Sequence, residues 1–223
     1  LKPVFGFGLL QIFCQFFKYY VHQKTAQNNM KQFLQVTGLL LVMFMFNSCG
    51  YNRMVALDEE VKSAWSQVEN AYQRRADLVP NLVATVKGVA NFEQETLTKV
   101  IEARSKATGV TIDPTKITPD AIQKFQEAQN ELSGALSRLL VSVEKYPELK
   151  ANQNFLELQS QLEGTENRIS VERKKFNETV QAYNTYVRKF PANIIAGMFG
   201  FQQKGYFEAD QGAEKAPTVD FGK

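Results

Sequence analysis

Charged side chains that could take part in chemistry interrupt two segments whose apolar residues otherwise repeat with the period of a helix. In the first segment, Arg75 falls where a hydrophobic residue is expected, and Asp77 follows it. In the last segment, four charged residues fill the gaps between apolar positions: Glu166, Arg168, Glu172 and Arg173. A buried charge needs a partner. We therefore predict that Arg75 pairs with Glu166 or Glu172. We also predict that Asp77 pairs with Arg168 or Arg173.

The predicted network would fix the register of packed helices, as buried polar groups do in coiled coils. A binding site for a ligand or a partner is the alternative. Histidine and cysteine residues, which could bind zinc or act in nucleophilic catalysis, are missing from the body of the chain. The only histidine, His22, and both cysteines, Cys14 and Cys49, precede residue 50. Residues 50–223 therefore supply neither a Cys/His zinc site nor a His- or Cys-based nucleophilic triad. We expect no catalytic residue, no metal site and no cofactor.

Composition and charge narrow the class of protein further. The chain has 223 residues, of which 44% are hydrophobic and 22% are charged, as in a globular domain with a sizeable core. Residues 1–48 hold four lysines and no acidic residue, whereas the whole chain has 26 basic and 23 acidic residues. The rest of the chain is therefore close to neutral, and we expect no nucleic-acid partner.

The first 48 residues resemble a targeting region. Met30 and Lys31, followed by the apolar run 36–46, have the order of a bacterial secretory signal. We predict a signal peptide or membrane anchor over residues 30–48. We interpret residues 1–29 as an over-extended gene model or an extra leader, and a first membrane segment over residues 4–20 is the alternative.

Cys49 directly follows this apolar region, between Ser48 and Gly50. The arrangement resembles the lipobox of bacterial lipoproteins, in which the cysteine thiol carries a diacylglycerol. We predict that Cys49 is lipidated, and an uncleaved anchor with an unmodified thiol is the alternative. Either one tethers the chain to a membrane and places residues 49–208 outside the cytoplasm, in the periplasm or at the cell surface.

The body of the chain has a helical period and no strand signal. The apolar pattern predicts helices over residues 51–88, 92–107, 119–145 and 152–190, with caps at Asn91, Thr118 and Asn152. Pro80 is expected to kink the first helix. Because short connections favour antiparallel neighbours, we predict an all-α, antiparallel four-helix up-and-down bundle with long helices, preceded by the membrane-targeting segment. Three long helices, with residues 52–107 unbroken, are the alternative.

Five aromatic residues lie within eighteen residues, from the end of the last predicted helix onward: Phe190, Phe199, Phe201, Tyr206 and Phe207. Aromatic residues at this density can cap the open end of a bundle. The alternative is a surface for a partner or for lipid headgroups. Four antiparallel passes would bring this segment back to the end at which the first helix begins. Residues 209–223 are expected to form a flexible tail.

Several sequence blocks, in this order, resemble the LemA family. They include AWSQV at 64–68, RRADLVPNLV at 74–83, YPELKA at 146–151 and GTENRI at 164–169, and the resemblance covers residues 50–208. It implies an N-terminal anchor and an extracytoplasmic four-helix bundle, with no established enzymatic activity. The chain departs from the family pattern at Phe176, where tyrosine is usual, and in having a lipobox in place of a full membrane span.

We therefore expect a membrane-tethered, non-catalytic interaction or scaffold protein of the bacterial cell envelope. Its expected partners are the membrane and an envelope protein. The alternative is an envelope hydrolase of the glycosidase type that uses paired carboxylates. Such an enzyme needs two carboxyl groups about 5–9.5 Å apart in a cleft, and a solid bundle offers no obvious cleft.

Overall fold

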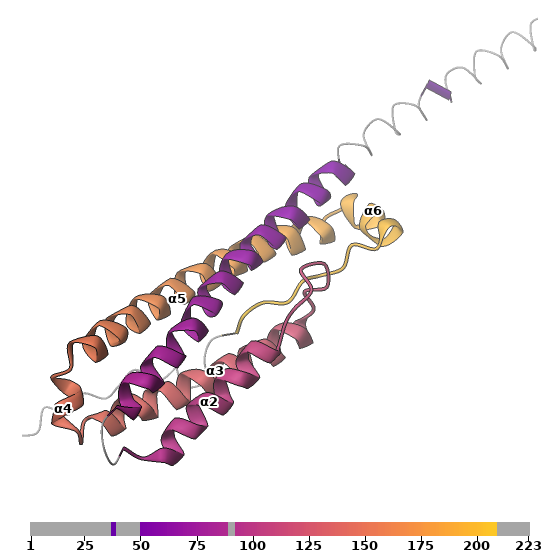
Figure 1. The fold of residues 1–223 in the computed structure, drawn as a ribbon. Helices are drawn as coiled ribbons and strands as arrows, with labels where there is room; N and C mark the ends of the chain where they lie inside the picture. Colours follow the sequence, from indigo (N-terminus) through magenta and orange to yellow (C-terminus); the bar gives the residue numbers. More distant parts are fainter. Residues whose placement is uncertain (1–36, 39–49, 89–91, 209–223) are drawn as a thin grey trace, which may run out of the picture. The chain divides into compact units, whose positions relative to one another are not determined.

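The computed structural model describes residues 37–38, 50–88 and 92–208 (Figure 1). Within these ranges all regular structure is helical, and no strand is present. The predicted anchor over residues 30–48, apart from residues 37–38, lies outside the described residues, as do Cys49 and the predicted tail over 209–223. Among the described residues, no helix combines the length and the apolar character that a membrane span requires.

The chain divides into two compact units, Leu1–Asn52 and Arg53–Lys223. In the first unit only residues 37–38 and 50–52 are described, and all of them are helical. The second unit holds the packed helices and both hydrophobic cores.

The N-terminal helix covers residues 50–87 and is not broken at Pro80, although a kink is expected there. A proline leaves the carbonyl four residues before it without its helical donor. Here that carbonyl belongs to Ala76, and it accepts a hydrogen bond from Arg104 Nε at 2.8 Å. A side chain from α2 (Gln94–Gly109) therefore supplies the bond that Pro80 removes.

The N-terminal helix stops at Gly88. The next two helices, α2 and α3 (Pro119–Val143), begin and end close to the predicted positions, and α2 ends at Gly109. The cap of α2 differs from the prediction, because Glu93 occupies the cap position without a side-chain hydrogen bond and Asn91 lies outside the described residues. Thr118 caps α3, as predicted, and α2 packs along α3.

The last long helix is α5 (Gln153–Arg188), which Asn152 caps as predicted. Two short helices are absent from the sequence-based prediction. One is α4 (Pro147–Lys150), which links α3 to α5, and the other is α6 (Ala192–Phe199), which follows Pro191 and packs on α5.

Buried apolar residues form two core clusters. The first contains Met54 and Trp65 of the N-terminal helix together with the last part of α5, the start of α3 and α6. The second contains the last part of the N-terminal helix together with α2, the end of α3, α4 and the start of α5. Trp65 contacts Phe176, whereas Arg75, further along the first helix, pairs with Glu166, which precedes Phe176. These two helices therefore run in opposite directions.

Candidate functional site

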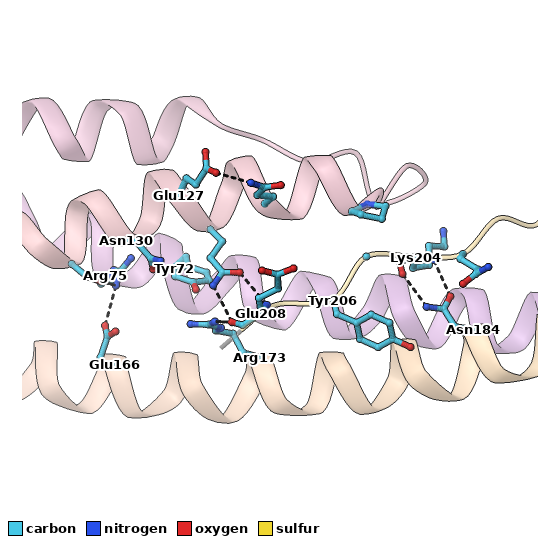
Figure 2. A pocket seen from close by; sticks show the side chains of 16 residues that line it. Tyr72, Arg75, Glu127, Asn130, Glu166, Arg173, Asn184, Lys204, Tyr206 and Glu208 are labelled. Carbon is cyan, nitrogen blue, oxygen red and sulfur yellow. Dashed lines mark hydrogen bonds and ion pairs between the residues drawn. The ribbon is translucent and has the colours of Figure 1, made fainter. Parts of the chain in front are cut away.

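The guanidinium of Arg75 joins three helices, and Figure 2 shows its ion pair with Glu166. Its Nη1 donates to Ser133 Oγ at 2.6 Å and to Glu166 Oε2 at 3.0 Å. Its Nη2 donates to the carbonyl and the side-chain oxygen of Gln129, at 3.2 and 2.7 Å. Only 2% of Arg75 is exposed, and its charge lies 5.0 Å from the centre of the Tyr72 ring. Arg75 thus ties the N-terminal helix to α3 and α5.

The other charged residues of the predicted network do not form the predicted pairs. Asp77 is exposed and accepts a hydrogen bond from Gln73 of its own helix at 2.8 Å, so its predicted pairing with Arg168 or Arg173 is wrong. Glu172 is buried beside Lys175, whose Nζ lies 3.3 Å away. Arg168 is exposed. Asp77 points toward solvent because it follows the buried Arg75 by two residues, which lie on nearly opposite sides of a helix.

Arg173 binds a segment whose position was not predicted. It donates to the carbonyl of Glu208 at 2.8 Å and lies 5.0 Å from the centre of the Phe207 ring. Both residues belong to an extended segment, residues 201–208, which we call the strap. The strap follows α6 and runs back along α5 and α3 (Figures 1 and 2).

Side-chain amides hold the strap by its main chain. Asn184 donates to the carbonyl of Lys204 and accepts from its N–H, both at 2.9 Å. Asn177 makes the same two bonds with Phe207, also at 2.9 Å. Gln126 of α3 makes them with Glu208, at 3.0 and 3.2 Å. Each amide therefore satisfies both polar groups of one strap residue, as a neighbouring strand would in a sheet.

The spacing of the two asparagines matches the geometry of the strap. Asn177 and Asn184 are seven residues apart on α5, which corresponds to about 10.5 Å along a helix axis. Lys204 and Phe207 are three residues apart in an extended chain, which corresponds to about 10 Å. Two turns of α5 therefore cover the same distance as three residues of the strap, so that each asparagine meets its own strap residue. The strap runs in the direction opposite to α5.

Lys204, which is buried, fixes the strap through an ion pair with the partly buried Asp58. Its Nζ lies 2.9 Å from Asp58 Oδ1, and Lys62 binds the other oxygen of Asp58 at 2.8 Å. Burial raises the pKa of Asp58, but the hydrogen bonds and positive charges of Lys62 and Lys204 outweigh burial, so this pKa lies below its ordinary value of 3.8. Lys204 also lies 5.6 Å from the ring of Tyr183. Burial, together with the charge of Asp58, raises the pKa of Tyr183 to about 12.

Gly205 lets the strap pass directly over the start of α3. Its N–H donates to the carbonyl of Ile117 at 3.1 Å. A Cβ atom at this position would lie 2.7 Å from Pro119 Cα and 2.9 Å from the carbonyl oxygen of Thr118. Only glycine fits such a close approach of two backbones.

The aromatic residues predicted as one surface divide into two groups. Phe207 is 5% exposed, and its ring packs against Trp65, Phe125 and Phe176, so its assignment to a surface is wrong. The main chain of Phe207 is bound to α5 and that of Glu208 is bound to α3. These bonds hold the strap in a position from which the Phe207 ring enters the core. The others are partly or largely accessible: Phe190, Phe199, Phe201 and Tyr206.

A polar groove of about 700 Å³ lies between the strap, α3 and α5. Arg75, Glu127, Glu166 and Glu208 are among the residues that line it (Figure 2). Glu166 is paired with Arg75, and Glu127 accepts from Gln123 at 2.9 Å. In the part of the chain that the structure describes, no group of three or more acidic, histidine or cysteine side chains is placed to hold a metal ion. The groove offers hydrogen-bonding groups to a polar ligand.

Sequence reasoning identified Arg75 and Glu166 but missed the residues that hold the strap: Gln126, Asn177, Asn184, Lys204 and Gly205. One signal was available. Asn184 is buried, and Asn177 and Asn184 lie a heptad apart, each directly after an aromatic residue of the apolar stripe. A polar residue repeated at this spacing next to a buried stripe indicates a partner other than solvent.

Comparisons with known proteins identify sequence relatives of this chain. A sequence model described as the LemA family matches residues 64–221. Protein LemA of Metamycoplasma hominis is 24% identical over 160 residues, which are 72% of this chain and 69% of that protein. Magnetosome protein MamQ 2 of Paramagnetospirillum magneticum is 25% identical over 177 residues, 71% of this chain and 64% of that protein. Magnetosome protein MamQ of Magnetospirillum gryphiswaldense is 25% identical over 196 residues, 78% of this chain and 71% of that protein.

Proposed function

Because this chain belongs to the LemA family, we propose that it is a membrane-tethered helical scaffold of the bacterial cell envelope, which presents its folded unit to a protein partner outside the cytoplasm and catalyses no reaction. One observation carries the non-catalytic part of the proposal. The buried charges of Arg75 and Lys204 bind groups of the protein's own helices, at distances typical of strong hydrogen bonds. Such charges fix a single arrangement of helices, which suits a binding surface.

The proposed architecture is an antiparallel four-helix up-and-down bundle. The opposite directions of the N-terminal helix and α5 support it, as does the packing of α2 along α3. Arg75 bridges the N-terminal helix, α3 and α5 by its side chain, which suits the role of a register-fixing residue.

The proposed tether is the region over residues 30–48, with a lipid on Cys49. Its support is the apolar run and the position of the cysteine in the sequence. Mass spectrometry of the protein isolated from its own membrane tests this part. We expect an N-terminus at Cys49 with added acyl mass. A retained upstream segment with an unmodified thiol would show that an uncleaved anchor tethers the chain.

The proposed envelope partner can be sought by site-specific photo-cross-linking in intact cells. A photoreactive residue at Tyr206, beside the groove, is compared with one at Val141, which is exposed on α3. We expect a discrete protein adduct at Tyr206 and none at Val141. Equal labelling at both positions would argue against the groove as the partner site.

The purified chain also tests the absence of catalysis. We expect it not to cleave envelope glycans. Cleavage that disappears in Glu127→Gln or Glu208→Gln, both in the groove, would replace the scaffold with a hydrolase.

A further inference from the structure

Helix α6 exposes an apolar face that no described residue covers. Phe190, Ile194 and Met198 are 81%, 55% and 76% exposed. Ile194 and Met198 are four residues apart on α6, which places them on one side of that helix. Phe190 lies in the turn that precedes α6. The opposite side of α6 is buried in the first core cluster through Ala192, Ile195 and Ala196. Helix α6 contains no charged residue.

The charges around this face are positive. Arg188 and Lys189 directly precede Phe190, and both are exposed. The sequence has no acidic residue between Glu178 and Glu208. On the neighbouring N-terminal helix, Asp58 is bound by Lys62 and Lys204, and Glu59 lies 2.7 Å from Lys62. An apolar face with exposed cations at its edge has the chemistry of a peripheral contact with an anionic lipid surface.

The position of α6 in the fold also favours lipid. Figure 1 shows α6 beside the first turns of the N-terminal helix, and both contribute residues to the first core cluster. The apolar sequence run 36–46 precedes that helix by a few residues. A tether in this run would keep α6 close to the bilayer and raise its effective concentration there. The closeness of α6 to the bilayer thus rests on the tether of the proposed function.

We propose that Phe190, Ile194 and Met198 form a second membrane contact, inserting into the interfacial layer of an anionic bilayer while Arg188 and Lys189 lie among the headgroups. The surface is small, so it binds effectively only in the tethered chain. Its consequence is orientation: two contacts at one end of the unit would fix how the groove faces the surrounding envelope.

Fluorescence quenching in vesicles tests this contact with the full-length chain. The chain is reconstituted in phosphatidylcholine vesicles, with or without phosphatidylglycerol. The acyl chains of both lipids carry bromine, which quenches tryptophan fluorescence. Tryptophan replaces Met198 or, as a control, Val141, which is 68% exposed on α3 and lies beside the second core cluster. The native Trp65 is fully buried and gives the same background in both variants.

We expect several-fold stronger quenching in Met198→Trp than in Val141→Trp. Phosphatidylglycerol should increase the quenching of Met198→Trp further, and the added double substitution Arg188→Gln and Lys189→Gln should remove this increase. Flotation of the vesicles measures separately whether the tether binds the chain to the bilayer. A chain that floats with the vesicles but shows equal quenching at both positions would overturn the α6 contact and leave the tether standing. A chain that does not float would overturn the tether. Dimerisation through α6 without lipid, abolished by Met198→Glu, would assign this face to a second copy instead.

Discussion

The side-chain amide of Asn184 exchanges two hydrogen bonds of 2.9 Å with the main chain of Lys204, one through each of its polar atoms. Lys204 in turn sends its side chain to Asp58 on the N-terminal helix, at 2.9 Å. The strap is therefore held to α5 by its backbone and to the N-terminal helix by a buried charge. A segment without regular structure thus becomes part of the core packing.

Asn184→Ala is expected to lower the free energy of unfolding by about 2–4 kcal/mol, because two buried main-chain groups of Lys204 lose their partner. Urea denaturation measures the loss, and hydrogen exchange at the amide of Lys204 locates it. Asn154→Ala, at an exposed position of α5, is the matched control and should change stability by less than about 0.5 kcal/mol. Equal effects of the two substitutions would contradict the role of Asn184.

Gly205→Ala is expected to cost about 1–3 kcal/mol, because the new Cβ would collide with backbone atoms of Pro119 and Thr118 that cannot easily move. Limited proteolysis of the strap, together with urea denaturation, measures the effect. Gly164→Ala in α5 provides the contrast, since its Cβ meets no neighbouring atom. It should stabilise the protein by about 0.5–1 kcal/mol through its higher helix propensity. A stable Gly205→Ala protein with a protected strap would contradict this prediction.

Arg75→Ala is expected to destabilise the protein by about 2–4 kcal/mol, since it leaves a cavity and removes the donor from buried groups of Gln129. Glu166→Gln should cost less than about 1 kcal/mol, because 57% of the Glu166 side chain is exposed and water screens its charge. Thermal and urea unfolding of both variants compare the two. A larger loss in Glu166→Gln would mean that the ion pair, and not the contacts with α3, stabilises this site.

The lowered pKa of Asp58 predicts that the stability of the protein decreases at acidic pH. Its pKa is lower in the folded chain than the ordinary 3.8, so the folded state binds this proton less readily than the unfolded state. The stabilisation is therefore present above the unfolded pKa and is lost as pH falls through the folded one. We expect the difference in unfolding free energy between wild type and Asp58→Asn to shrink as pH falls from about 5 to about 2. A difference that stays constant with pH would show that the Asp58 carboxylate is not the group responsible.

The helices could be predicted from the sequence because their signals are local. Thr118 and Asn152 cap helices in the structure as predicted, and Gly109 ends α2. A hydrophobic period of 3.6 residues depends on neighbours along the chain and not on distant contacts. The same phase identified Arg75 as buried, because it interrupts an apolar stripe. The predicted pairing of Asp77 was wrong because it did not follow this phase, which places Asp77 on the side of the helix away from Arg75.

The path of the strap, and which of its aromatic residues are buried, depend on contacts with distant helices. Phe207 and Tyr206 are adjacent, yet one is buried against Trp65 and the other is exposed. No period distinguishes them, because the strap is positioned by bonds to Gln126, Asn177 and Asn184 on two distant helices. Local residue preferences therefore indicate the long helices and the buried charge of Arg75, but not the short helices α4 and α6. Which groups meet that charge, and where the chain runs after α6, depend on non-local contacts that local residue preferences do not contain.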